Sequence, residues 1–183
     1  MKNGFTLLEL LITVTVLGIL LAFAVPNFGP MMSTSKMTNL SEELRNLVMM
    51  GRSEAVFRNA PVYLHFLGLE KDVSNKNGRF CLVVSVSDTL TNCSDDTGKL
   101  YITTGEQFSR LEVTRTHDKS FIKFGHVNGR PEGIASGSAE YEKILDFGGP
   151  QNKIDFKVNG AGTVKVCDPS GTSSQYKSCH IPR

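Results

Sequence analysis

Hydrophobic residues run almost unbroken from Phe5 to Val25, and the chain becomes mixed in character after that point. One ionisable side chain, Glu9, lies inside this first run. As an α-helix the run spans roughly 30 Å, which matches the hydrocarbon core of a bilayer. We therefore expect residues 5–25 to form a transmembrane or assembly helix. A cleavable signal peptide and a plain membrane anchor are the alternatives, but neither gives Glu9 a role.

An amphipathic helix is expected to follow over residues 26–60. From Met37 to Ala55, apolar residues recur at steps of three and four, and charged residues lie mostly off this stripe. The helix should end near Arg58, because Pro61 disfavours helical geometry for the residue before it. This segment therefore has one face that can pack on a globular domain.

Prolines near the junction of the two helical segments predict a local interruption. Pro26 and the Gly29-Pro30 pair favour a kink or a partly melted stretch near residues 26–30, because proline removes a backbone hydrogen bond inside a helix. Ser35 or Thr38 could cap a restarted helix if the break is complete.

After Pro61 the pattern changes to short apolar runs separated by polar and glycine-rich turns. The strongest of these candidate strands, residues 80–86, is apolar nearly throughout and should be buried on both faces. The others are residues 62–67, 100–103, 111–116, 120–124, 144–147, 154–158 and 163–167. No helical periodicity separates them. We therefore expect an α+β protein, in which a long N-terminal helix packs on one or two antiparallel sheets formed by residues 61–183.

Four cysteines, Cys81, Cys93, Cys167 and Cys179, predict two disulfides in an oxidising compartment. The simplest pairing follows sequence order, with twelve positions between partners in each case, although other pairings stay open. A zinc site fits poorly, because there is no C-x-x-C step and His180 directly follows Cys179. The second bridge would clamp a C-terminal loop.

Charge and motifs exclude several classes of function. The chain carries 20 basic and 18 acidic residues, which is not the signature of a general polyanion-binding protein. It contains no G-x-S-x-G, no H-E-x-x-H and no phosphate-binding glycine loop. Its four histidines lie far apart, and His65 alternates with apolar neighbours as a core or edge residue does. We predict no catalytic residues, no metal site and no cofactor.

The N-terminal segment Gly4-Phe5-Thr6-Leu7-Leu8-Glu9-Leu10, preceded by Lys2, resembles the class III signal of type IV pilins and type II secretion pseudopilins. The resemblance implies that residues 1–4 are a leader peptide and that prepilin peptidase cleaves between Gly4 and Phe5. It also implies N-methylation of Phe5. Glu9 would then pair with the Phe5 amine of a neighbouring subunit during assembly.

A second segment, Gly51-Arg52-Ser53-Glu54-Ala55 continuing to Val62, resembles the helix end of the GspH/FimT branch of minor pilins and pseudopilins. Together with the N-terminal segment, this resemblance covers residues 1–65 well and the rest of the chain more loosely. Considered without the resemblance, the charged residues here fit an exposed helix face with a Glu54–Arg58 pair at i,i+4.

Together, the resemblances imply a minor pilin with a pilin-like fold that helps to prime or cap a type IV pilus, or else an H-type pseudopilin of a type II secretion system. Its partners would be prepilin peptidase, other minor and major pilins or pseudopilins, and an inner-membrane assembly platform. It would be a single-pass protein of the inner membrane, with its globular domain in the periplasm, and would enter the fibre near the tip. The two-disulfide pattern and the slightly basic tail favour the pilus.

DNA binding for natural transformation is a weaker alternative. Some members of this branch are thought to bind DNA through a Gly-Arg-x-Arg motif near the last strand, but Gly162-Thr163-Val164-Lys165 lacks both arginines. The candidate contacts are Lys165, Lys177 and Arg183, in a region from residue 151 onward that has five basic and two acidic residues. An ordinary solvated surface explains this modest excess equally well.

Overall fold

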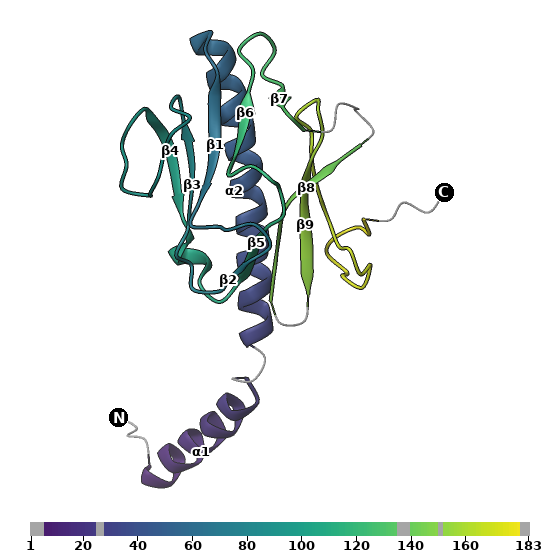
Figure 1. The fold of residues 1–183 in the computed structure, drawn as a ribbon. Coiled ribbons are helices and arrows are strands. Elements are labelled where there is room, and N and C mark those ends of the chain that lie inside the picture. The colour runs from purple at the N-terminus through teal and green to yellow at the C-terminus, as the bar shows by residue number, and fades with distance from the viewer. Residues whose placement is uncertain (1–5, 25–27, 135–139, 150–151, 180–183) are drawn as a thin grey trace.

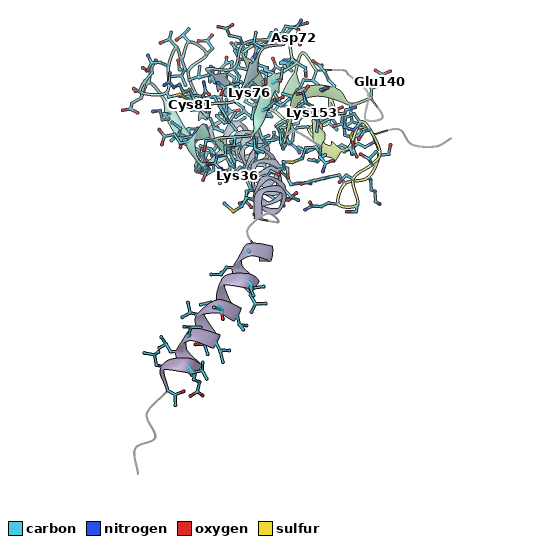
Figure 2. All side chains as sticks on the ribbon, turned by 90° about the horizontal axis from the view of Figure 1, so that it is seen from below. Lys36, Asp72, Lys76, Cys81, Glu140 and Lys153 are labelled. Atoms are coloured by element: carbon cyan, nitrogen blue, oxygen red, sulfur yellow. A yellow bond between two sulfur atoms is a disulfide. The ribbon has the colours of Figure 1, made fainter. Side chains whose placement is uncertain are left out.

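A computed structural model of the chain describes residues 6–24, 28–134, 140–149 and 152–179. A long helix, α2 (Phe28–Arg58), lies against two five-stranded antiparallel sheets (Figure 1). The preceding helix, α1 (Leu7–Ala24), projects away from this domain in both views (Figures 1 and 2). The predicted α+β class, with a long N-terminal helix on antiparallel sheets, is confirmed.

Helix α2 begins earlier than the proline pattern suggested. Pro30 lies in its first turn, where backbone N–H groups have no partner within the helix, so the missing donor costs no hydrogen bond. Ser35 and Thr38, considered above as caps for a restarted helix, lie inside α2. Pro26 and the other residues of the 25–27 segment lie outside the described residues.

The C-terminus of α2 has a defined cap. Asn59 adopts a positive φ of 49°. The N–H of Ala60 donates to the carbonyl of Ala55, and that of Asn59 donates to the carbonyl of Val56, both at 3.2 Å. This pair of bonds is the Schellman arrangement, which satisfies carbonyls that a helix end would otherwise leave unpaired. The helix therefore ends at Arg58, shortly before Pro61.

The first sheet has the order β4-β3-β1-β6-β7 and the second has the order β10-β9-β8-β5-β2. The first contains β1 (Val62–Leu67), β3 (Cys81–Ser85), β4 (Lys99–Thr104), β6 (Phe121–Phe124) and β7 (Pro131–Glu132). The second contains β2 (Ser74–Asn75), β5 (Glu112–Arg115), β8 (Glu142–Gly148), β9 (Lys153–Val158) and β10 (Val164–Cys167). A short 3₁₀ helix, η2 (Gly105–Phe108), follows β4.

Eight strands fall where the hydrophobic pattern predicted them, and two do not. The unpredicted strands are the two-residue β2 and β7, which lie at the outer edges of their sheets. Their residues are polar or proline, so they have little strand propensity of their own. They are strands because the neighbouring β5 and β6 offer hydrogen-bonding partners.

One hydrophobic core joins α2 to both sheets. The inner face of α2 buries Leu40 and Leu44 completely, and they share a core with Phe66 and Phe124 of the first sheet and Phe147 of the second. Completely burying side chains of this size stabilises the fold by about 2 kcal/mol each. The amphipathic pattern of the sequence therefore positions α2 between the sheets.

A second, smaller cluster lies on the outer face of the first sheet. It contains Leu67, Cys81, Val83 and Leu90, with Cys93 packed against it. Leu67, Cys81 and Val83 are strand residues that alternate with those of the main core, so they point to the opposite face. Leu90 comes from the loop after β3. The β3–β4 loop, residues 86–98, folds back over this face and is held there by the Cys81–Cys93 disulfide. This cover explains why all of β3 is buried.

Candidate functional site

The start of α1 is the predicted processing and assembly site. Gly4 and Phe5 lie outside the described residues. Thr6, just before the helix, accepts a hydrogen bond at its Oγ1 from the backbone N–H of Glu9, at 3.3 Å. Thr6 is thus the N-cap, and Glu9 is the third residue of α1. The cap places the carboxylate of Glu9 in the first helical turn, where the helix dipole favours a negative charge.

The rest of α1 is an apolar helix without a buried face. Every described side chain from Leu7 to Ala22 is exposed, including Leu8 at 67% and Ile19 at 58%. The hydroxyl of Thr13 donates to the carbonyl of Leu10 at 2.8 Å, and Thr15 makes the same kind of bond to Leu11 and Ile12. Both hydroxyls are therefore satisfied within the helix, which suits apolar surroundings. Figure 2 shows the side chains of α1 spread around the helix, clear of the domain.

Within the described residues, no helix is both long enough and apolar enough to cross a membrane. The predicted span, residues 5–25, begins and ends outside those residues. Its membrane-spanning role therefore stays a prediction.

The C-terminal part of α2 carries the second motif. Arg52 is half-buried, and its guanidinium donates from Nε to the carbonyl of Gly129 and from Nη1 to the carbonyl of Gly162, both at 3.1 Å. Gly129 belongs to the β6–β7 turn and Gly162 to the β9–β10 turn. The interpretation of Arg52 as part of an exposed face is therefore corrected: Arg52 fastens a turn from each sheet to the helix.

The expected pair next to Arg52 is present. Arg58 Nε contacts Glu54 Oε2 at 2.7 Å, which confirms the i,i+4 pair. Glu54 also accepts a hydrogen bond from the hydroxyl of Tyr101 on β4, at 3.2 Å. The motif thus links α2 to both sheets by polar contacts, and these roles are structural.

Both turns need glycine where Arg52 meets them. Gly129 and Gly162 have φ values of 64° and 77°, which L side chains rarely adopt. A Cβ on Gly162 would lie 2.8 Å from Nε of Arg52. Asn159 completes the β9–β10 turn, because its Oδ1 accepts from the N–H groups of Ala161 and Thr163.

The C-terminal loop is clamped at its base. Cys167 and Cys179 form a disulfide with a Cα–Cα distance of 4.9 Å, so both bridges follow sequence order. Between them, Asp168 is 2% exposed and accepts hydrogen bonds from the N–H and hydroxyl of Ser170 and from the N–H of Ser173, at 2.6–2.7 Å. These bonds, first among them that from the Ser170 hydroxyl, lower the pKa of Asp168 to about 2. Asp168 therefore acts as the acceptor around which the loop turns.

The same loop touches α2 near its N-terminal half. The hydroxyl of Tyr176 lies 3.2 Å from Oγ1 of Thr38, and Nε2 of Gln175 donates to that oxygen at 2.9 Å. The loop thus lies against the helix that leads into α1. The Asp-Pro-Ser-Gly sequence that opens the loop is a turn signal that could have pointed to Asp168.

Two of the three basic residues proposed for DNA contact, Lys165 and Lys177, lie in the part of the chain that the structure describes. Lys165 on β10 lies in register with Lys157 on β9, and Nζ of Lys165 is 5.8 Å from the centre of the Tyr141 ring. Lys157 pairs with Asp155 at 3.3 Å. Lys177 is exposed on the clamped loop, whereas Arg183 lies outside the described residues.

Two histidines, His65 and His117, are buried and contact groups of the protein. His65 is 1% exposed, and its Nε2 lies 2.9 Å from the carbonyl oxygen of Ser87. Burial lowers the pKa of His65 below its ordinary value. His117 is also buried and contacts Glu142. In the part of the chain that the structure describes, no group of three or more His, Cys, Asp or Glu side chains could hold a metal ion.

A capped, solvent-exposed apolar helix that leads into an amphipathic helix packed on antiparallel sheets defines the class of pilin-like subunits. The chain belongs to the family described as "Type II transport protein GspH", which matches residues 40–179. Residues 1–25 match the family described as "Prokaryotic N-terminal methylation motif".

A solved structure shows the same fold. One crystal form of the type IV minor pilin FimU of Pseudomonas aeruginosa (strain PAO1) superposes on this chain with a TM-score of 0.53. The two sequences are 18% identical, and the match covers 82% of this chain and 100% of the FimU chain. Its second crystal form is also 18% identical, covers 78% of this chain and 99% of its own, and gives a TM-score of 0.49. A comparison with curated proteins found no significant match.

Proposed function

We propose that this chain is a minor pilin that helps to prime or cap the assembly of a type IV pilus. The observation that carries the proposal is α1, whose apolar side chains are exposed from Leu7 to Ala22, with one carboxylate, Glu9, in its first turn. A helix that is apolar all round needs apolar partners on every side. A bundle of like helices and a bilayer both supply them.

Prepilin peptidase would remove residues 1–4 and leave Phe5 as a methylated amino terminus. An ionised carboxylate in an apolar environment costs about 3 kcal/mol on insertion scales unless it is paired. The amine of Phe5 on a neighbouring subunit can supply that pair and so set the stagger between helices. Until extraction by the assembly platform, α1 holds the subunit in the inner membrane, with the globular domain in the periplasm.

An H-type pseudopilin of a type II secretion system is the second candidate, favoured by the name of the matching family. The same processing and the same Glu9 pairing serve both machines. The pilus is preferred on the two disulfides and the slightly basic tail, and because the similar solved structure is a type IV minor pilin. Loss of surface pili on gene deletion supports the pilus, whereas loss of secreted enzymes with pili intact supports the secretion system.

DNA binding is a third candidate, and Lys165 and Lys177 are its described residues. Neutralising both in Lys165→Gln/Lys177→Gln should abolish a salt-sensitive gel shift if they contact phosphates. A chain that shifts no DNA at low salt excludes this function.

The decisive test of processing is the intact mass of the native protein from cells with and without prepilin peptidase. We expect a chain that begins at N-methylated Phe5 only when the peptidase is present. A chain that begins at Val25 would show that the N-terminus is a disposable signal and would overturn the proposal.

The test of assembly uses Glu9→Val, which removes the carboxylate and leaves Gly4 and Phe5, the residues on either side of the proposed cleavage, unchanged. The intact mass of the variant checks that it is processed. We expect this variant to accumulate in the inner membrane and to be missing from sheared pili. Thr13→Val is the matched control, since the Thr13 hydroxyl bonds only to its own helix in the described contacts. Normal incorporation of Glu9→Val would remove the proposed role of Glu9.

A further inference from the structure

A small open pocket lies on the outer face of the first sheet, beside the area that the 86–98 loop covers. Its floor consists of Tyr63 on β1 and Phe121 on β6. Its walls come from Asp88 on that loop, Lys119 on the β5–β6 turn, and Lys123 and Glu132 on β6 and β7. None of these residues has a part in the function proposed above.

The floor of the pocket is aromatic and rigid. The rings of Tyr63 and Phe121 meet edge to face, with centroids 5.4 Å apart and planes at 85°. Both side chains are half-buried, so part of each ring remains accessible. His65 packs against both rings, with centroid distances of 6.1 and 5.6 Å, and is fixed by its contact with the carbonyl of Ser87.

The walls of the pocket are polar, and other parts of the fold or neighbouring wall residues hold them. Asp88 lies on the loop that the Cys81–Cys93 disulfide pins to the sheet. The backbone at Lys119 is held by the buried Arg115, whose Nη1 donates to the Lys119 carbonyl at 2.9 Å. Lys123 pairs with Glu132 at 2.7 Å. The backbone of the site is therefore held in place before a ligand binds, which lowers the entropic cost of binding.

The charges around the rings select the ligand. Two lysines and two carboxylates balance, so the pocket does not favour an anion such as a nucleic acid. A purely apolar peptide would have to desolvate these charged groups without hydrogen-bonding them. A ligand with hydroxyl groups can accept from the ammonium of Lys119 and donate to the carboxylate of Asp88. Its polarised C–H groups can lie on the electron-rich ring faces.

We propose that this pocket binds one saccharide unit, with a C–H face of the sugar on Phe121 and Tyr63 and its hydroxyls bonded to Asp88 and Lys119. The site is shallow and charged, and a millimolar dissociation constant is the expected range, which corresponds to about −4 kcal/mol. The proposal does not depend on the role of the chain in a fibre, because it concerns the isolated subunit.

Saturation-transfer NMR on the full chain in an amine-oxide detergent tests the proposal, since a maltoside detergent would itself supply sugar. The probes are methyl α-D-glucopyranoside, methyl β-D-galactopyranoside and N-acetyl-D-glucosamine. We expect transfer to the ring C–H protons of at least one probe, reduced at least five-fold in Phe121→Leu and at least three-fold in Asp88→Asn. Phe57→Leu is the matched control, because Phe57 is an 86% exposed ring outside the pocket and should leave the signal unchanged.

Absence of transfer to all three probes from the wild-type chain overturns the proposal. So does a signal that Phe57→Leu reduces as much as Phe121→Leu, since that would mean unspecific contact with exposed rings. If Phe121→Leu fails to fold, Asp88→Asn decides, because Asp88 is exposed and outside both apolar cores. An unchanged signal in Asp88→Asn then rejects the site.

Discussion

Arg52 on α2 donates from Nη1 to the carbonyl oxygen of Gly162 at 3.1 Å, across 110 residues of sequence. The same guanidinium holds the carbonyl of Gly129, so a turn from each sheet is fixed to a single side chain. The two sheets also share the apolar core that packs against α2. Arg52 is therefore the polar contact that sets the positions of the two turns relative to the helix.

Replacing Arg52 should loosen both turns. Arg52→Ala removes two hydrogen bonds from a charged donor, each worth about 1.5–3 kcal/mol, and we expect a loss of about 3 kcal/mol in the free energy of unfolding. Urea denaturation of the detergent-solubilised chain measures it. The matched control is Arg58→Ala on the same helix, which breaks only the Glu54–Arg58 pair and should cost about 0.5 kcal/mol or less. Equal losses would show that Arg52 has no special role.

Gly51 should resist substitution although it lies inside a helix. Alanine improves helix propensity by about 1 kcal/mol, but a Cβ at position 51 would lie 2.5 Å from Cε2 of the buried Phe124 ring. Overpacking of this kind costs about 1–3 kcal/mol, so the steric effect should win. We expect Gly51→Ala to lower the midpoint of thermal unfolding.

Gly18→Ala provides the comparison for Gly51, because nothing lies within 4 Å of a Cβ at Gly18 on α1. This variant should leave the unfolding midpoint of the domain unchanged. A stabilised Gly51→Ala protein would mean that the Phe124 ring moves aside at little cost.

Asp168 should make the C-terminal loop sensitive to acid. Its pKa is lowered from the ordinary 3.8 to about 2 in the folded chain. A depressed carboxyl pKa stabilises the folded state fully above the ordinary value, and this contribution is lost as the pH falls towards the folded value. The stabilising effect of Asp168 should therefore disappear between about pH 4 and pH 2.

Asp168→Asn isolates this effect from the other acidic groups. The difference in unfolding midpoint between wild type and Asp168→Asn should be largest above pH 4 and should shrink as the pH falls to 2. The amide has a single acceptor oxygen, so it cannot accept from the N–H groups of both Ser170 and Ser173 as the two carboxylate oxygens do, and the variant is less stable at neutral pH. A difference that is independent of pH would contradict the assignment.

The two disulfides should contribute unequally. Each closes a loop with a sequence separation of 12, for which chain entropy suggests about 3 kcal/mol. Cys81→Ala/Cys93→Ala should cost more than Cys167→Ala/Cys179→Ala, because the first bridge also keeps the loop, with its Leu90, over Leu67 and Val83. Urea midpoints measure the cost, and binding of an apolar dye measures the exposed cluster. A larger loss from the C-terminal pair would contradict this order.

Much of the fold could be predicted from local pattern. Apolar steps of three and four residues gave α2, and short apolar runs gave eight strands, because each element must bury one face or both. The Schellman cap could be anticipated only in outline, from Pro61. The edge strands β2 and β7 could not be predicted, since two polar or proline residues form a strand only when a neighbour pairs with them.

The candidate site likewise has features that the sequence predicts and features that it does not. The segment around Glu9 can be recognised from the sequence, because its residues are contiguous. The cap of the helix that carries Glu9 is also local, since Thr6 is only three positions away. The contacts of Arg52 cannot be predicted from the sequence, because a half-exposed arginine on a helix looks the same in sequence whether its partners are water or distant carbonyls. The pocket on the first sheet combines Tyr63, Asp88 and Phe121, which no spacing rule connects.

The sequence by itself determined what depends on nearby residues: an apolar N-terminal helix with one acid, an amphipathic helix, a set of strands, and an even number of cysteines. Helical and strand periodicities, caps and turns act over a few residues, so they are readable in order. The tertiary structure alone decided which turns Arg52 holds, where the 86–98 loop covers the sheet and which aromatic rings it leaves open. These features depend on contacts between residues far apart in the chain, and packing in three dimensions sets them.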